Sequence, residues 1–252
     1  EGAKTFKDLI PKADILVEDH PPGELEGLAL GYSDLEEVNP GLIMLSVTEF
    51  GQTGPYRNWK GTDLNILAMG GMSTMIGDKD REPLALAGHQ GHYNGSVHAF
   101  SGILAALLQR DITGQGQYID VSLHDAMAFS EWKGFTFYAA DGKIRSRGTE
   151  ASATSYLLPC KDGYVGFMPN RPEYMGPLVE LTGLEQLKDP KYASIEGLNK
   201  NAKEIRDLLA EWVKDKKQEE VYHRSQRSGL PFCYFPNMAE LMNSPQYVSR
   251  KF

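Results

Sequence analysis

The chain contains little cysteine, no long apolar run and no excess of positive charge. Cys160 and Cys233 are the only cysteines among its 252 residues, too few for a disulfide framework or for a zinc site made of cysteine. We therefore expect both to be small buried hydrophobes in a reducing cytoplasm, and we expect no metal. No apolar run comes near the roughly 18 residues that cross a bilayer, which predicts no membrane partner.

The charge balance is acidic. Lysine and arginine number 26 against 34 acidic residues, a formal net charge of -8. Nucleic acid binding needs a concentrated basic face, whereas these basic residues are scattered along the chain. The sequence therefore predicts no nucleic acid partner, while a local pocket for a phosphate group stays compatible with it.

The length suffices for two modest domains. Residues 1–150 read as an α/β unit and residues 151–252 as a smaller α+β unit. Glu1 begins abruptly in what reads as the end of a helix, so we expect the natural chain to start earlier.

The first part alternates strand and helix patterns. Residues 13–18 form a β-rich run that is stopped by prolines, and 42–47 form a second continuous apolar run. Between them, 33–38 read as a short helix capped by Ser33 with Glu36 three residues later. Strand, helix and strand in this order predict a parallel sheet with two buried strands.

Further helices and one more strand complete this part. We expect a loop over 50–61 and a helix over 63–75, which Asp63 caps or begins. A second helix over 95–110 should bury Val97, Phe100, Ile103, Leu104, Leu107 and Leu108. The pattern then predicts a strand over 118–123 and a helix that includes Ala126, Met127, Phe129 and Trp132. We expect the cluster of Met69, Met72 and Met75 to be core.

The segment 88–95 is a polar loop that enters the helix at 95–110 from its N-terminus. Such a position favours anions, because the free backbone N–H groups of the helix point toward it. His89, Gln90 and His92 lie in this segment. His89 and Gln90 either satisfy local backbone groups or line a pocket.

Residues 151–252 show a different pattern, in which short strands alternate with turns. Lys161, Asp162 and Gly163 read as a hairpin turn between short strands. Residues 201–216 form an amphipathic pattern that predicts a helix with its apolar side inward, namely Ile205, Leu208, Leu209 and Trp212.

Several sequence blocks in this order resemble the class III coenzyme A transferases, the family of formyl-CoA transferase and the carnitine CoA-transferases, with α-methylacyl-CoA racemase as a cousin. The resemblance implies a Rossmann-like large domain with a parallel sheet, a small α+β domain and two interlocked protomers. This chain corresponds to the middle of the family pattern. The blocks are Ala-Asp-Ile-Leu-Val-Glu at 13–18, Phe-Gly-Gln-Thr-Gly-Pro-Tyr at 50–56, Thr-Asp-Leu-Asn-Ile-Leu-Ala-Met-Gly-Gly at 62–71, Gly-Ile-Leu-Ala-Ala-Leu-Leu at 102–108, Thr-Gly-Gln-Gly-Gln-Tyr-Ile-Asp-Val-Ser-Leu at 113–123 and Lys-Asp-Gly at 161–163.

The resemblance places His92 where the family has its nucleophilic aspartate, ten residues before Gly102. In the family, that carboxylate attacks the acyl-CoA thioester and becomes an aspartyl-CoA thioester, which an incoming acid takes over. An imidazole lacks the carbonyl carbon that would hold the sulfur of the coenzyme. His92 therefore cannot replace the nucleophile, and it either fills a vestigial site or serves as a general acid or base.

The resemblance also implies a residual coenzyme A site. Lys60 matches a lysine of the formyl-CoA transferase branch, and Asp19 with His20 stand where relatives place an asparagine and an aromatic residue beside the adenine. Pro21 and Gly27 stand where relatives often carry arginines, so phosphate contacts are expected to be reduced.

Three functions stay open. The first is a CoA-transferase that moves CoA between an acyl-CoA and a free carboxylic acid, with this chain as the subunit that lacks the aspartate; the dimer is a homodimer or a heterodimer, with a heteromer favoured. The second is an acyl-CoA isomerase or lyase that uses His92 or His89, although Thr62 in place of a histidine disfavours a true racemase. The third is a non-catalytic acyl-CoA binding protein.

Overall fold

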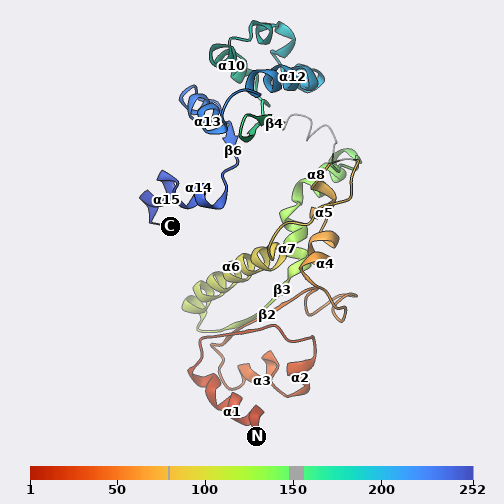
Figure 1. Ribbon diagram of the computed structural model, residues 1–252. Coiled ribbons are helices and arrows are strands. Elements are labelled where there is room, and N and C mark those ends of the chain that lie inside the picture. Colours follow the sequence, from red (N-terminus) through yellow and green to blue (C-terminus); the bar gives the residue numbers. More distant parts are fainter. Residues whose placement is uncertain (79, 148–155, 252) are drawn as a thin grey trace. The chain divides into compact units, whose positions relative to one another are not determined.

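The structure is a computed structural model that describes residues 1–78, 80–147 and 156–251 (Figure 1). It divides into two compact units, residues 1–147 and residues 148–252. Among the described residues, no helix is long and apolar enough to cross a membrane.

Unit 1 contains a parallel sheet of β1 (Ile15–Glu18), β2 (Ile43–Thr48) and β3 (Gln117–Ser122) in the order β1-β2-β3. The predicted parallel pairing is confirmed, with Ile15 opposite Ile43 and Ile43 opposite Gln117. The central strand β2 is buried along almost its whole length. The expectation that β1 is equally buried is wrong: Val17 is 59% exposed, because β1 pairs on one side only among the described strands.

Short helices follow β1 and precede it. These are α1 (Gly2–Leu9), the 3-10 turn η1 (Ile10–Lys12), α2 (Glu24–Gly27) and α3 (Tyr32–Glu36). Leu25, Leu30 and Leu35 pack with Leu42 and Met44 in one core cluster. The predicted Ser33 cap is wrong, because α3 begins one residue earlier and Gly31 occupies its N-cap position without a side-chain hydrogen bond.

The helix expected over 63–75 is broken in two, α4 (Asp63–Met69) and α5 (Met72–Met75). Gly71 lies between them at φ +89°, a left-handed conformation that glycine adopts without steric cost. Met69, the last residue of α4, is 42% exposed, so the expected methionine core is wrong at that position. Ile66 and Leu67 form the buried side of α4 instead.

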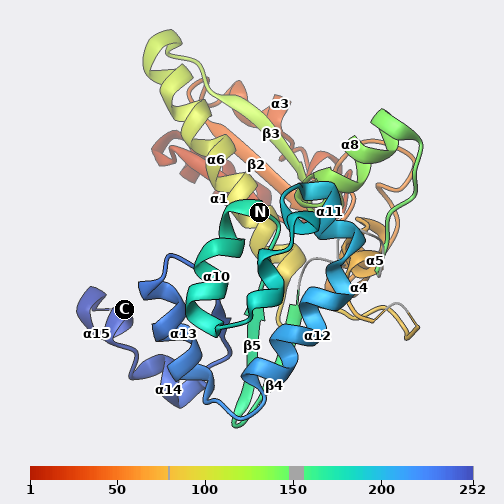
Figure 2. The same cartoon turned by 90° about the horizontal axis from the view of Figure 1, so that it is seen from above.

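The long helix α6 (Gln90–Thr113) begins five residues earlier than predicted. His92 therefore lies in its first turn and not in a loop. The helix runs alongside β2 and β3 (Figures 1 and 2), and its buried residues are Gly91, Gly95, Ala99 and Ala106.

The predicted buried side of α6 is largely exposed. Val97, Phe100, Leu104 and Leu108 all face solvent in this chain. The physical reason is close packing: a Cβ on Gly95 would collide with the side chain of Leu123, so only small residues fit against the neighbouring elements.

Two helices follow β3, α7 (Leu123–Ser130) and α8 (Trp132–Asp141), where a single helix was expected. Ser122 caps α7 by accepting a hydrogen bond from the backbone N–H of Asp125 at 3.1 Å. Leu123 and Met127 pack on Ile66 and Leu67 of α4, while Phe129 is exposed.

Unit 2 contains an antiparallel sheet in the order β4-β5-β6, made of β4 (Tyr156–Cys160), β5 (Gly163–Phe167) and β6 (Cys233–Tyr234). Cys160 pairs with Gly163, so the predicted hairpin is confirmed. Asp162 in the turn accepts the backbone N–H of Gln218 at 2.8 Å. The expectation of a buried Cys233 is wrong, since the chain alternates there and buries Phe232 while Cys233 is exposed.

Helical segments pack around this sheet. The predicted helix over 201–216 is confirmed as α12, which lies against β4 (Figure 2) and buries Ile205 and Leu209. The hydroxyl of Tyr156 donates to the carbonyl of Ala202 at 2.6 Å, and burial raises the pKa of Tyr156 to about 12. The segments are η2 (Pro172–Tyr174), α10 (Met175–Thr182), η3 (Glu185–Lys188), η4 (Pro190–Tyr192), α11 (Ile195–Lys200), α12 (Ala202–Val213), α13 (Gln218–Arg227), α14 (Met238–Met242) and α15 (Pro245–Arg250).

Candidate functional site

Two adjoining hollows lie in unit 1, beyond the carboxyl ends of β1 and β2. Glu49 and Gly61 line both of them. Asp19 directly follows β1, and Thr48 is the last residue of β2; both line the first hollow. The carboxyl edge of a parallel sheet is where ligands of open α/β folds bind. These hollows are therefore the candidate site.

The first hollow has a volume of 390 Å³, and its lining includes Asp19 and Lys60, two of the residues that the resemblance assigned to the coenzyme site. It also contains Arg57, which sequence reasoning missed. Both cations are exposed and three residues apart in the same loop. They offer two charged donors to a phosphate group, which partly offsets the expected loss of arginines after β1.

The loop that carries these cations is held by aromatic stacking and by one carboxylate. Trp59 stacks on Tyr56 at 3.9 Å between ring centroids, and Phe50 contacts both rings edge-on. Asp120 of β3 accepts the backbone N–H of Gln52 at 3.0 Å. Burial raises the pKa of the Asp120 carboxyl above its ordinary value. The loop is thus anchored at both ends.

The second predicted neighbour of the adenine, His20, turns elsewhere. Its Nδ1 lies 3.4 Å from Oε1 of Glu24, and its backbone N–H donates to Glu18 at 2.7 Å. The structure therefore brings Asp19 and Lys60 together but does not bring His20 to the lining of the same hollow.

The second hollow has a volume of 860 Å³ and lies at the first turn of α6. His92 and Tyr93 line it from α6 and His89 from the N-cap position before α6. Asp63 and Leu64 line it from α4 and Thr62 from the N-cap position before α4. Thr62 caps α4 in a capping box with Asn65, which sets the direction of α4 and places Asp63 opposite α6.

Asp63 and His92 form the closest polar pair of this hollow. Nδ1 of His92 lies 2.8 Å from Oδ1 of Asp63, and the backbone N–H of His92 donates to the same oxygen at 3.1 Å. The Asp63 side chain is 12% exposed and that of His92 45%. Burial raises the pKa of the Asp63 carboxyl, but the hydrogen bonds and charge of His92 outweigh burial and hold that pKa below its ordinary value.

Asp63 therefore has a second role besides beginning α4: it holds the N-terminus of α6. Sequence reasoning missed this contact because Asp63 and His92 are 29 residues apart and belong to different helices. No local pattern reports such a pair.

The side chains of His89 and Gln90 have different surroundings in the structure. His89 is exposed, occupies the N-cap position of α6 and faces the second hollow, with its ring 6.0 Å from that of His92. Gln90 donates from Nε2 to the carbonyl of Ala87 at 3.0 Å, which is the local backbone role weighed from the sequence.

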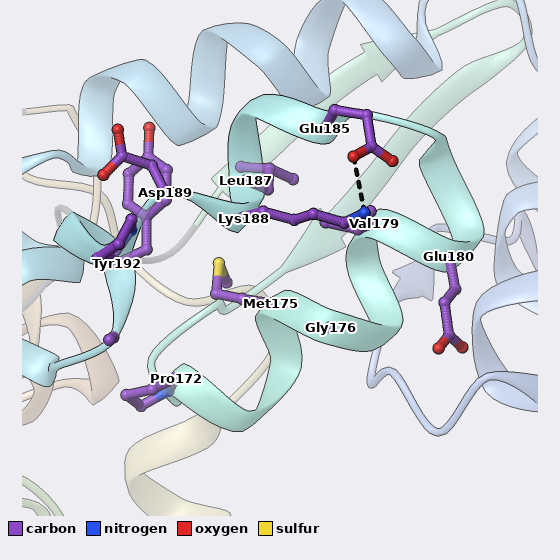
Figure 3. A pocket seen from close by; sticks show the side chains of 12 residues that line it. Pro172, Met175, Gly176, Val179, Glu180, Glu185, Leu187, Lys188, Asp189 and Tyr192 are labelled. Carbon is purple, nitrogen blue, oxygen red and sulfur yellow. Dashed lines mark ion pairs between the residues drawn. The ribbon is translucent and has the colours of Figure 1, made fainter.

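A separate hollow of 540 Å³ lies in unit 2 (Figure 3). Met175, Val179, Leu187 and Tyr192 contribute to its lining, and Lys188 pairs with Glu185 at 2.7 Å. None of the site residues predicted from the sequence lines this hollow, so it is not part of the candidate site.

The whole chain matches one protein family. The family model described as CoA-transferase family III matches residues 1–252. The chain belongs to CoA-transferase family III. The resemblance seen in the sequence blocks is thereby confirmed.

Two curated members of family III illustrate the similarity. The chain is 30% identical over 256 residues to succinyl-CoA--D-citramalate CoA-transferase of Chloroflexus aurantiacus, covering 100% of this chain and 64% of the relative. It is 31% identical over 267 residues to a subunit of succinyl-CoA:(R)-benzylsuccinate CoA-transferase of Thauera aromatica, again over 100% of this chain and 64% of the relative. The chain thus spans less than two thirds of either relative.

Solved structures show the same fold. A CAIB/BAIF family protein from Brucella suis matches with a TM-score of 0.83 at 30% identity, over 99% of this chain and 67% of that protein. A hypothetical protein from Mycobacterium tuberculosis matches with a TM-score of 0.86 at 24% identity, over 99% of this chain and 68% of that protein. The mixed α/β architecture with its parallel sheet is therefore that of the family.

Proposed function

We propose that the protein containing this chain is a CoA-transferase that moves CoA between an acyl-CoA and a free carboxylic acid, in which this chain is the subunit without the nucleophilic aspartate. Its two units would then be the Rossmann-like large domain, in part, and the small α+β domain of the family.

The observation that carries this proposal is the side chain in the first turn of α6. His92 lines the second hollow at the positive end of a helix of 24 residues, a place that would stabilise an ionised carboxylate. A histidine there cannot form the aspartyl thioester of the family reaction. A sister chain would have to supply the aspartate.

The two hollows support a division of the substrate. Arg57 and Lys60 would bind the phosphates of coenzyme A in the first hollow, with Asp19 toward the adenine. The acyl thioester would then reach the second hollow, beside His89 and His92. Glu49 and Gly61 line both hollows, which supports one long substrate lying across the two.

An interlocked dimer, favoured as a heteromer, would cover the apolar side of α6. Val97, Phe100 and Leu108 are each more than half exposed in the isolated chain, an arrangement typical of surfaces that contact another protein. Relatives from Chloroflexus aurantiacus are named as alpha and beta subunits of succinyl-CoA--L-malate CoA-transferase. A partner chain of the same family is therefore the expected neighbour.

The Asp63–His92 pair favours a second candidate. An imidazole held by a carboxylate at 2.8 Å is oriented to accept or donate a proton at its other nitrogen. An acyl-CoA isomerase or lyase would use it beside the thioester carbonyl, with His89 as the second acid or base. Acyl-CoA binding without catalysis is the outcome if neither reaction is found.

The test uses the full-length protein purified alone and together with any co-purifying chain. CoA exchange between an acyl-CoA and a free acid should be absent in the protein alone and present in a complex with a sister chain. Native mass spectrometry should show that this sister chain has a different mass. The variant His92→Asp, given acyl-CoA, should accumulate a hydroxylamine-sensitive thioester on the protein, seen by intact mass.

Each alternative has its own outcome. Rapid exchange by the wild-type protein as a homodimer, with a covalent CoA adduct on it, would contradict the proposal. Exchange of an α-proton of acyl-CoA with solvent deuterium, lost in His92→Ala, would support the isomerase or lyase instead.

A further inference from the structure

Three metal-binding side chains converge at the second hollow. One ligand atom each of Asp63, His89 and His92 can be chosen so that all lie within 4.8 Å of one another. His89 and His92 are three residues apart at the start of α6, a spacing that puts them on one side of a helix. Asp63 comes from the start of α4 and faces them across the hollow.

The distances suit a shared ion as well as a hydrogen bond. With metal–nitrogen and metal–oxygen bonds of roughly 2.0–2.1 Å, two ligands of a tetrahedral ion lie about 3.3 Å apart. Nδ1 of His92 and Oδ1 of Asp63 are 2.8 Å apart, so a small outward movement of either side chain would admit an ion between them.

A second and independent observation is the other oxygen of the same carboxylate. Oδ2 of Asp63 is buried and has no hydrogen-bond partner among the described residues. A buried carboxylate oxygen without a partner is destabilising, because it has lost its hydration without gaining a hydrogen bond. A cation held by Oδ2 would supply the partner that this oxygen lacks.

We propose that Asp63, His89 and His92 bind one divalent transition-metal ion of the zinc class. Two imidazoles and one carboxylate are the donor set of zinc, cobalt or nickel sites, whereas magnesium and calcium prefer oxygen ligands throughout. Three protein ligands leave a fourth position, which faces the 860 Å³ hollow. The proposal does not depend on the transferase function, since it concerns the free protein without acyl-CoA.

The sequence-based expectation of no metal considered only the two cysteines as an anchor. The site proposed here uses no cysteine, and its carboxylate lies 26 residues before His89 in the chain, so spacing alone does not reveal it. The histidine at the family's aspartate position thereby acquires a function of its own.

The test is a titration of the full-length protein after its metal has been removed with a chelator. Co²⁺ should bind at one equivalent and give the visible absorption of a tetrahedral nitrogen and oxygen site, and Zn²⁺ should displace it. Mg²⁺ should not compete.

The decisive variant is His89→Ala, because the exposed His89 side chain caps no backbone group of α6 and its removal should leave the fold intact. It should weaken Co²⁺ binding at least about 100-fold, more than the loss of an outer contact would. The matched control is His98→Ala, which removes a histidine of the same helix outside the cluster and should bind like the wild type.

Two results would overturn the proposal. One is the absence of a tetrahedral Co²⁺ spectrum in the wild type at equimolar metal. The other is a spectrum and affinity unchanged in both His89→Ala and His92→Ala, which would mean adventitious binding elsewhere. Because the readout is optical and needs no acyl-CoA, its failure is distinguishable from failure of the transferase proposal.

Discussion

At the scale of single residues, Asp63 joins two helices through one carboxylate. It begins α4, accepts the backbone N–H of His92 in the first turn of α6, and pairs with the His92 ring. Its charged form is favoured by these contacts, against the opposing effect of burial. The contribution of Asp63 to stability must therefore depend on pH.

We predict that Asp63→Asn lowers the free energy of unfolding at neutral pH by about 1–3 kcal/mol, and that its difference from wild type shrinks in acid. Because the folded-state pKa is below the unfolded value of about 3.9, the stabilisation is fully present above that value and is lost as pH falls through the folded-state pKa. Urea unfolding from neutral pH down to about pH 3, with chelator present, measures it.

The control for this series is Asp111→Asn, which removes an exposed carboxylate near the other end of α6. It should leave the pH dependence of unfolding like that of the wild type. A constant difference between wild type and Asp63→Asn across the whole pH range would show that Asp63 acts through its shape and not through its charge.

A second prediction at this scale concerns the cations of the first hollow. Arg57→Ala and Lys60→Ala should each weaken binding of coenzyme A to the full-length protein by about tenfold, the equivalent of roughly 1.4 kcal/mol for one charged hydrogen bond. Calorimetric titration measures the affinity, and added salt should reduce the difference from wild type.

Lys4→Ala, which removes an exposed lysine of α1 that does not line the hollow, is the control. Equal effects of all three substitutions would indicate a general charge effect and would contradict a phosphate site at Arg57 and Lys60.

At the scale of elements, α6 offers two glycines with opposite surroundings. A Cβ on Gly95 would collide with Leu123, while a Cβ on Gly102 would meet Ile119 at an ordinary contact distance of 3.4 Å. In the absence of a clash, alanine is favoured over glycine within a helix by about 1 kcal/mol. Alanine substitutions at Gly95 and Gly102 therefore distinguish the effect of packing from the effect of helix propensity.

We predict that Gly95→Ala lowers the free energy of unfolding by about 1–3 kcal/mol through overpacking, whereas Gly102→Ala leaves it unchanged or raises it by up to about 1 kcal/mol. Chemical denaturation of the two variants beside wild type measures both. A stabilised Gly95→Ala variant would mean that α6 and α7 are not packed as closely as described.

Elements with a strong local pattern could be predicted from the sequence, and those shaped by packing could not. The hairpin at Asp162 and the apolar side of α12, with Ile205 and Leu209, needed only turn chemistry and periodicity. On α6, periodicity selected the large apolar residues, while the structure buries the small ones. The close packing of α6 against Leu123 determines which side of α6 is buried. The sequence of α6 alone does not reveal this contact.

The same limit applies to the candidate site. The sequence pointed to Asp19, Lys60 and the start of α6, because the family resemblance assigns a role to each of these positions. It missed Arg57, to which the resemblance assigned no role, and it missed the partner of His92, which comes from another helix. Contacts between distant segments depend on the fold as a whole.

At the scale of the whole molecule, unit 2 has a hydrophobic core of its own. That core runs from Tyr156 to Phe232 and contains no residue of unit 1. Inside it, Phe167 stacks on Phe232 at 4.1 Å. A unit with a complete core should fold without the rest of the chain.

We predict that a fragment of residues 156–252 is folded and unfolds cooperatively, with the helical circular dichroism expected for α10, α12 and α13. In the same fragment, the variant Tyr156→Phe, which loses the hydrogen bond to Ala202, should be less stable by about 0.5–1.5 kcal/mol. Thermal unfolding followed by circular dichroism measures the cooperativity of the fragment and the stability difference of the variant. A fragment without a cooperative transition would show that unit 2 depends on unit 1.

The parallel sheet has a consequence for the newly made protein. Ile43 of β2 pairs with Gln117 of β3, 74 residues later in the chain. At synthesis rates of about 5–20 residues per second, β2 emerges from the ribosome roughly 4–15 seconds before its partner exists. During that interval the edge of β2 that later pairs with β3 is free, and the apolar side chains of β2 are incompletely buried. We therefore expect a chaperone to hold the nascent chain at β2.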